Sequence, residues 1–222
     1  MKQKIAIGLI GLGNRGRDLL EEIILKRRDV DVAAVCDLYE DRREAAAATV
    51  ERERGVRPAA VQDYAEVLAM PGVDAVVISA SWAAHSRIAI AAMEAGKYVA
   101  SEVGGAFSLQ ECWRLVETYE RTKVPCMLLE NCCYGRDEMM VLHMVRQGVL
   151  GDIVHCSGGY HHDLRGEIAT GNEKRHYRLE QYLHRNCENY PTHELGPIAR
   201  VLDINRGNRM VSLVSVASKA RG

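Results

Sequence analysis

A glycine-rich turn near the start of the chain constrains its fold more than any other feature. The segment 11–16, Gly-Leu-Gly-Asn-Arg-Gly, follows an apolar run and precedes a stretch with helical spacing. Glycine permits a tight strand-to-helix turn and a close approach of the backbone, so a pyrophosphate can bind the unsatisfied amides of the helix N-terminus. The turn predicts dinucleotide binding through Gly11, Gly13, Asn14, Arg15 and Gly16. The alternative is a glycine turn in an α/β protein without a nucleotide.

An acidic residue at the expected distance strengthens this prediction. A second apolar run, 32–36, ends in Asp37. It lies about twenty residues beyond the last glycine, where a carboxylate accepts hydrogen bonds from ribose hydroxyls. Asp37 favours NAD over NADP, because its charge would repel a 2′-phosphate. Arg42 and Arg43 lie close enough in the sequence to leave NADP open as an alternative.

Short aliphatic runs alternate with helical stretches as far as about residue 132. This alternation is typical of a parallel sheet covered on both faces. The expected strands are 4–10, 31–36, 75–79, 98–101 and 126–130, with a weaker one at 59–61. Helical spacing covers 15–28, 86–95 and 109–121. The fold class expected for residues 1–132 is α/β, an NAD-binding Rossmann domain with a doubly wound parallel sheet.

The pattern changes beyond Cys132, which predicts a second domain over residues 133–222. The polar segment 161–189 has little periodicity, which suits a functional loop region. The elements expected around it are a helix over 135–147, strands over 152–160 and 210–217, and a helix that begins at Pro191.

This second domain is therefore expected to be a C-terminal α/β domain with an open sheet for substrate binding and oligomerisation. It looks truncated, because the chain ends directly after its second expected strand. Unpaired strand edges and an uncovered apolar face are liabilities, so we expect a homo-oligomer.

Composition excludes several classes of partner. The 29 Lys and Arg residues nearly balance the 30 Asp and Glu residues, which gives no field to attract a nucleic acid or an anionic membrane. No apolar run is long enough to span a bilayer and no cleavable signal pattern precedes the first strand, so we expect a cytoplasmic protein. Seven cysteines without CxxC spacing argue against a disulfide framework and a zinc ribbon.

The clustered residues His161, His162 and Asp163 raise the question of a metal. Neighbouring residues of a strand point to opposite faces, so these three side chains cannot all bind one ion. We expect no metal site.

Ligands of open α/β sheets bind at the carboxyl ends of the strands. The residues expected at those ends are Trp82, His85, Glu102, Val103, Glu130 and Asn131. Each also has a purely structural interpretation, such as packing for Trp82 or a turn for Asn131.

The polar region and the helix after it supply candidates for acid–base chemistry. His193 is the best candidate, because the unperturbed pKa of histidine lies near neutrality. Tyr190 precedes it by three residues and shares the start of the same expected helix, so both side chains can address one substrate hydroxyl. Tyr160 and Arg178 add a hydroxyl and a cation.

Together these residues resemble the glucose-fructose oxidoreductase, inositol dehydrogenase and rhizopine-catabolism (Gfo/Idh/MocA) family. The resemblance rests on 11–16, Asp37, the run 74–78 leading to His85, the segment 95–102 and a histidine at the head of a later helix. It implies an N-terminal Rossmann domain and a C-terminal α/β domain whose open sheet faces a carbohydrate substrate.

Two departures separate the chain from the sugar dehydrogenases of that family. Those enzymes carry Glu-Lys-Pro with a catalytic lysine where this chain has Glu102-Val103-Gly104. They usually place an aspartate four residues before the helix histidine, where this chain has Asn189. Both departures fit a branch of the family, the NAD-dependent α-N-acetylgalactosaminidase-like glycoside hydrolases.

Short motifs carry the resemblance to that branch. They are Gly-Asn-Arg-Gly at 13–16, Glu-Val at 102–103, Gly-Gly-Tyr at 158–160, His-Asp-Leu-Arg at 162–165, Tyr-Pro-Thr-His at 190–193 and Asn-Arg-Gly-Asn-Arg at 205–209. The implied NAD contacts are Asn14, Arg15, Asp37, Trp82, His85, Glu102, Val103, Asn131 and His193. The implied sugar contacts are Tyr160, Arg178, Tyr190 and His193. Glu194 stands where the branch commonly has glycine.

The resemblance implies a glycosidase that oxidises its sugar only transiently. Hydride passes from C3 to NAD, a base removes the acidified C2 proton, the C1 group is eliminated, water adds at C1 and the hydride returns. We expect His193 to handle the C3 hydroxyl proton, Tyr160 or Tyr190 the C2 or leaving-group proton, and Arg178 to orient the sugar. One alternative is an NAD(P)-dependent sugar or polyol dehydrogenase, and another is a protein that binds NAD or a sugar without turnover.

Overall fold

The computed structural model describes residues 4–219 and divides the chain into two compact units. The first unit is Met1–Leu129 and the second unit is Glu130–Gly222. Within residues 4–219, no helix combines the length and apolar character that crossing a bilayer requires.

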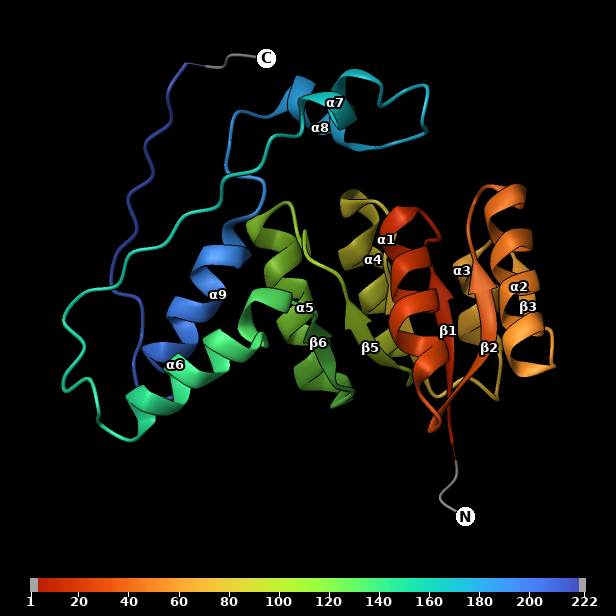
Figure 1. The fold of residues 1–222 in the computed structure, drawn as a ribbon, viewed down its shortest axis with the longest axis horizontal. Helices are drawn as coiled ribbons and strands as arrows, with labels where there is room; N and C mark the ends of the chain where they lie inside the picture. Colours follow the sequence, from red (N-terminus) through yellow and green to blue (C-terminus); the bar gives the residue numbers. More distant parts are fainter. Residues whose placement is uncertain (1–3, 220–222) are drawn as a thin grey trace. The chain divides into compact units, whose positions relative to one another are not determined.

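The first unit is built on a six-stranded, fully parallel sheet (Figure 1). Its strand order is β3-β2-β1-β4-β5-β6, which places the reversal of strand order between β1 and β4. The strands are β1 Ile5–Ile10, β2 Val30–Cys36, β3 Ala59–Val61, β4 Ala75–Ile78, β5 Tyr98–Ser101 and β6 Cys126–Leu128. The expected doubly wound Rossmann sheet is confirmed, including the weak strand at 59–61.

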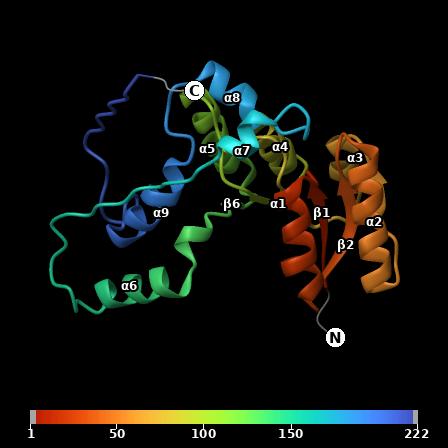
Figure 2. The ribbon, with the colours of Figure 1, turned by 45° about the horizontal axis from the view of Figure 1, so that its top comes forward.

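Helices cover both faces of this sheet, as Figure 2 shows from a second direction. The regular helices of the unit are α1 Asn14–Asp18, α2 Glu40–Arg54, α3 Tyr64–Ala69, α4 Trp82–Glu94 and α5 Leu109–Thr122. One hydrophobic core lies between the sheet and the segments containing α1 and α2, and a second lies between the sheet and α3 and α4. Leu9, near the carboxyl end of β1, is fully buried in the first core, and Ile78, at the end of β4, is fully buried in the second.

The helix expected over 15–28 is irregular. It consists of α1, a π-helical turn η1 Leu19–Ile23 and a 3₁₀ turn η2 Ile24–Lys26. Leu19, Leu20 and Ile24 are buried as their spacing predicts, but Ile23 is 51% exposed. Ile23 is the last residue of the wider π-turn, whose geometry shifts it around the helix axis and out of the apolar stripe.

The second unit is helical and irregular in its described part. Its helical segments are η3 Asn131–Cys133, α6 Arg136–Arg146, α7 Arg165–Ala169, α8 Arg178–His184 and α9 Pro191–Val201. α6 packs beside α9, and the Arg200 guanidinium on α9 donates to the Cys133 carbonyl (2.8 Å) (Figure 1). The helix expected over 135–147 and the start of a helix at Pro191 are both confirmed.

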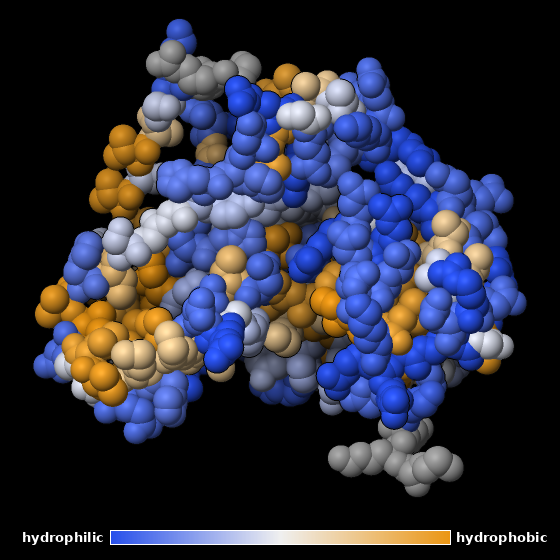
Figure 3. All heavy atoms as spheres, in the orientation of Figure 1, coloured by the Kyte–Doolittle hydropathy of each residue, from blue (hydrophilic) through white to orange (hydrophobic). Residues whose placement is uncertain are grey.

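The two strands expected in the second unit do not form. Segments 152–160 and 210–217 are without strand pairing in the structure, and the only β-bridge within 130–219 joins Ile204 to Asn208. Val211 and Val216 are 88% and 90% exposed, and hydrophobic side chains line this segment in Figure 3. A β-strand needs a hydrogen-bonded neighbour, and the described residues give these segments none.

Candidate functional site

The glycine turn of the first unit has the shape of a phosphate cradle. Gly11 has φ +93°, and a Cβ there would lie 2.4 Å from the Ala80 nitrogen. A Cβ on Gly16 would lie 2.0 Å from the Gly11 carbonyl oxygen. Gly13 is the N-cap of α1, and no side chain caps the helix there. A Cβ on Gly13 would meet only the Arg42 guanidinium, at 3.8 Å. Only glycine fits the two tight positions, and the free amides of α1 face the space at Gly13.

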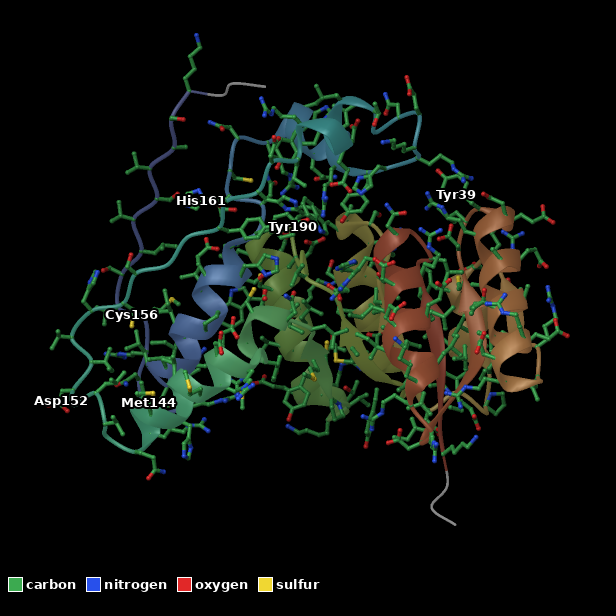
Figure 4. The ribbon with its side chains drawn as sticks, viewed as in Figure 1. Tyr39, Met144, Asp152, Cys156, His161 and Tyr190 are labelled. Atoms are coloured by element: carbon green, nitrogen blue, oxygen red, sulfur yellow. The ribbon has the colours of Figure 1, made fainter. Side chains whose placement is uncertain are left out.

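Asp37 lies at the carboxyl end of β2, beside this turn. Its carboxylate accepts hydrogen bonds from the Leu12 amide (2.7 Å) and the Tyr39 amide (2.9 Å), and the residue is only 9% exposed. Each oxygen keeps a lone pair for a further donor, such as a ribose hydroxyl. The Arg43 guanidinium donates to the carbonyl of Asp37 (3.3 Å), and the Arg42 guanidinium lies 4.8 Å from the Tyr39 ring centre. Figure 4 labels Tyr39 at the head of α2.

An ion pair joins the glycine turn to the end of β5. The Arg15 guanidinium contacts Oε1 of Glu102 with two nitrogens, each at 2.8 Å. The Glu102 side chain is 8% exposed and that of Arg15 is 49% exposed, so the buried carboxylate is neutralised from the solvent side. The neighbouring Val103 is 8% exposed and presents a hydrocarbon side chain at the position of the family's usual lysine.

Two predicted residues of α4 are more deeply buried. Trp82 is 3% exposed, and a Cβ on Gly104 would lie 2.1 Å from its ring. The His85 Nε2 lies 2.9 Å from the Ala80 carbonyl oxygen, and the residue is 1% exposed. Burial lowers the pKa of His85, so the imidazole is neutral near pH 7. Both residues fix the shape of the unit at the carboxyl ends of β4 and β5.

The second unit brings three predicted rings together. The ring centres of Tyr160 and Tyr190 lie 5.0 Å apart, those of Tyr160 and His193 4.8 Å, and those of Tyr190 and His193 5.1 Å. Tyr190 is the N-cap of α9 and His193 lies in its first turn, so the backbone of α9 sets the spacing of these two rings. Figure 4 labels Tyr190 there. Tyr160 reaches the pair from an irregular segment.

A carboxylate expected at a strand end, but not as a partner of His193, completes this cluster. Oε1 of Glu130 lies 2.7 Å from Nδ1 of His193 and also accepts from the Cys132 amide (3.0 Å). Burial disfavours the charged form of Glu130, but hydrogen bonds from Thr192, His193 and the Cys132 amide outweigh it and lower its pKa. The neighbouring Asn131, an expected NAD contact, is exposed. The only signal for Glu130 was its position at the end of the expected strand 126–130.

Arg178 lies against the ring cluster through a hydrogen bond. Its guanidinium donates to the Tyr190 hydroxyl and to the Glu167 carboxylate, which also contacts Nε2 of His176 at 2.9 Å. Burial raises the pKa of Tyr190 to about 12, and the nearby Arg178 charge only partly offsets this. Tyr190 is therefore protonated at neutral pH, and it can donate a hydrogen bond or a proton. Glu167, the anchor of Arg178, was not predicted.

The sequence cluster of His161, His162 and Asp163 separates in the structure. Nδ1 of His162 lies 2.5 Å from the Tyr160 hydroxyl, whereas Asp163 pairs with the Arg165 guanidinium (2.7 Å). Figure 4 labels His161 on the irregular segment before α7. Burial raises the pKa of Tyr160, so its hydroxyl also carries a proton at neutral pH.

The first unit matches a known family. Residues 5–129 match the model described as an oxidoreductase family with an NAD-binding Rossmann fold. The chain belongs to this oxidoreductase family. The predicted cofactor, NAD, agrees with this membership, and the glycine cradle and Asp37 fit its pyrophosphate and ribose. Residues 134–222 match a second model, the C-terminal domain of glycosyl hydrolase 109. The predicted resemblance to the Gfo/Idh/MocA family and its glycosidase branch is thus confirmed.

Individual proteins extend this comparison. The chain is 41% identical over 220 residues to a glycosyl hydrolase family 109 protein of Solibacter usitatus, covering 96% of this chain and 50% of the relative. It is 37% identical over 223 residues to an α-N-acetylgalactosaminidase of Shewanella oneidensis, covering 98% of this chain and 48% of the relative. The chain thus spans about half the length of these curated relatives.

A solved structure shares the fold at low sequence identity. It is scyllo-inositol dehydrogenase of Lactobacillus casei with bound NAD(H) and scyllo-inositol, at TM-score 0.68 and 18% identity. The match covers 90% of this chain and 56% of that protein. At this identity the likeness concerns the fold alone.

Proposed function

We propose that this chain carries the catalytic residues of an NAD-dependent glycoside hydrolase that is redox-neutral overall and acts on an α-N-acetylgalactosaminide-like sugar. The observation that carries the proposal is the cluster of His193, Glu130, Tyr160 and Tyr190 in the second unit. The names of the two curated relatives support the substrate class. A hydrocarbon side chain at Val103, in place of the dehydrogenases' lysine, supports a glycosidase over a simple dehydrogenase.

When bound, NAD supplies a reversible oxidation of the sugar at C3, which acidifies the hydrogen at C2. His193 accepts the proton of the C3 hydroxyl on Nε2. A carboxylate only accepts hydrogen bonds, so Oε1 of Glu130 at 2.7 Å selects the tautomer of the neutral imidazole that carries its hydrogen on Nδ1 and its lone pair on Nε2. Glu130 also stabilises the imidazolium that forms when Nε2 takes up the proton.

The two tyrosines divide the remaining proton transfers. The Tyr160 hydroxyl lies 2.5 Å from Nδ1 of His162, which accepts its proton when Tyr160 takes up the proton from C2 of the sugar. The Tyr190 oxygen accepts from Arg178, so its own hydrogen is directed to another acceptor, the oxygen of the leaving group. Arg178, held by Glu167, orients the sugar.

The test combines binding and turnover on the 222-residue chain. NAD binding is measured first by calorimetry, and then an aryl α-N-acetylgalactosaminide is supplied with NAD while aglycone release and NADH absorbance are followed together. We expect aglycone release that depends on NAD without accumulation of NADH. NADH accumulation without aglycone would identify a sugar dehydrogenase, and binding of NAD and sugar without any product would identify a binding protein.

A matched pair of variants assigns the role of His193. His193→Asn removes the base, and we expect turnover to fall by at least about 100-fold while NAD binding is retained. His143→Asn changes an exposed histidine on α6 and should leave both quantities unchanged. Full turnover in His193→Asn would exclude His193 from the chemistry.

A further inference from the structure

Three chemically different metal ligands meet within the second unit. The Glu130 carboxylate, the Cys132 thiol and the His193 imidazole each offer one ligand atom, and these atoms lie within 4.8 Å of one another. Sγ of Cys132 is 3.5 Å from Nδ1 of His193, and Oε1 of Glu130 is 2.7 Å from the same nitrogen. The side chains of His193 and Glu130 are 11% and 5% exposed. Among residues 4–219, no other group of His, Cys, Asp and Glu side chains meets this criterion.

The donor set matches one class of cation. Zinc binds thiolate sulfur at about 2.3 Å and imidazole nitrogen or carboxylate oxygen at about 2.0 Å, so ligand atoms around tetrahedral zinc lie about 3.3 to 3.5 Å apart. The sulfur to nitrogen distance of 3.5 Å already has this value. The oxygen to nitrogen distance of 2.7 Å is that of the hydrogen bond present without a metal, and it would widen by about half an ångström.

The backbone around these ligands is closely packed. A Cβ on Gly196 of α9 would lie 2.9 Å from Sγ of Cys133 and 3.0 Å from Cγ of Glu130. The missing side chain therefore lets α9 approach the η3 segment, which brings His193 to Glu130 and Cys132. The Cys132 amide also donates to Glu130 (3.0 Å) and fixes the carboxylate. The three ligands thus come from backbone segments in direct contact.

We propose that Glu130, Cys132 and His193 form a binding site for zinc or a similar thiophilic divalent cation. Binding forms metal bonds to Sγ, Nδ1 and a carboxylate oxygen without any change of oxidation state. The S–H bond breaks and releases its proton to solvent, while the ring hydrogen of His193 exchanges through solvent from Nδ1 to Nε2, so that the imidazole stays neutral. Three protein ligands leave a fourth position open to water. The cation replaces the hydrogen bond between Glu130 and His193.

The consequence for turnover rests on the proposed function, whereas the site itself does not. Because the cation takes the ring nitrogen that Glu130 orients, zinc inhibits any chemistry that uses His193 as a base. Failure of the glycosidase assay therefore leaves the metal titration fully interpretable.

The test uses the reduced, NAD-loaded 222-residue chain and Co²⁺ as a spectroscopic probe, with Zn²⁺ competing for the same site. We expect one equivalent of Co²⁺ to produce a thiolate-to-metal absorption band that Zn²⁺ removes. Cys132→Ser should abolish the band, and Glu130→Gln, which keeps the shape of the side chain, should weaken Zn²⁺ binding by about tenfold or more. Cys187→Ser, which changes an exposed cysteine of the same unit, should behave as the parent chain.

Two results would overturn the proposal. One is the absence of saturable Co²⁺ uptake by the parent chain at micromolar concentrations. The other is an unchanged band in Cys132→Ser, which would place the bound metal on other cysteines. Far-ultraviolet circular dichroism of each variant without metal checks the fold. If Cys132→Ser proves unstable, the Zn²⁺ affinity of Glu130→Gln tests the site instead.

Discussion

The two units build their candidate sites from different materials. In the first unit the cradle is made mostly of main chain: glycines without space for a Cβ and free amides at the start of α1, with one side-chain carboxylate that two further amides hold in place. In the second unit the site is made of side chains, three rings and the groups that hold them, on α9 and on irregular segments. A site of main chain depends on local geometry, whereas a site of side chains depends on contacts between distant residues.

The largest loss of stability is expected when a substitution adds one methyl group to the glycine turn of the first unit. Gly11→Ala places a Cβ 2.4 Å from the Ala80 nitrogen at φ +93°, so the glycine turn and the segment between β4 and α4 must move apart. We expect a loss of several kcal/mol of stability, of which about 1–3 kcal/mol is backbone strain, together with loss of NAD binding. Both tryptophans, Trp82 and Trp113, lie in the first unit, so urea unfolding followed by tryptophan fluorescence measures this unit.

The control is a glycine with the same backbone strain and open space. Gly55, after α2, has φ +74° and no atom within 4 Å of an added Cβ. Gly55→Ala should cost only about 1 kcal/mol and leave NAD binding intact. Equal losses in the two variants would mean that the clash at Ala80 relaxes, and that the cradle is less rigid than its geometry indicates.

The same difference explains how much of the fold the sequence predicts. The segment 11–16 and the acid at Asp37 are local signals, and the sheet follows because buried parallel strands appear as continuous apolar runs. The irregularity at Ile23 could not be predicted, because a π-turn leaves no signal in the apolar spacing. The runs 152–160 and 210–217 contain the β-branched residues that are typical of strands, but a strand also requires a neighbour that local pattern does not supply.

The candidate site of the second unit could be predicted only in part. Tyr190 and His193 share the first turn of α9, so their proximity follows from Pro191 and helix geometry. Glu130 lies 63 residues before its partner His193, and nothing local distinguishes it from other acids. Short helices α7 and α8 lie within the segment predicted as a loop, because helices of 5 and 7 residues are too short to repeat an apolar stripe.

A smaller effect is expected from the one ion pair that adds side chains to the main-chain site. Arg15→Ala leaves the buried Glu102 carboxylate without its partner, whereas Glu102→Gln removes the buried charge and keeps the shape. Because Arg15 is half exposed, we expect about 1 kcal/mol of lost stability for Glu102→Gln and more for Arg15→Ala. Urea unfolding gives the stabilities, and calorimetry gives the NAD affinity.

The order of these two variants is the informative result. If Glu102→Gln were the more damaging, the carboxylate would have a role beyond neutralising Arg15, and the first site would depend on side chains as the second does. A matched exposed pair, Arg121 and Glu94 on α5 and α4, serves as control, and Glu94→Gln should change stability by less than about 0.5 kcal/mol.

The smallest effect is the pH dependence of stability, which we expect to differ between the buried His85 and an exposed histidine. Burial lowers the pKa of His85 from its ordinary 6.5, so the unfolded chain takes up a proton before the folded first unit does. The contribution of His85 to stability is therefore complete above about pH 6.5 and declines as the pH falls below it, by at most about 1.4 kcal/mol per pH unit. Urea midpoints at pH 7.5, 6.5 and 5.5 should fall more steeply for the parent chain than for His85→Gln, whereas His143→Gln, at an exposed position, should follow the parent. An equal dependence of the urea midpoint on pH in the parent and in His85→Gln would contradict this prediction. It would mean that His85 takes up its proton as readily in the folded unit as in the unfolded chain, despite its burial.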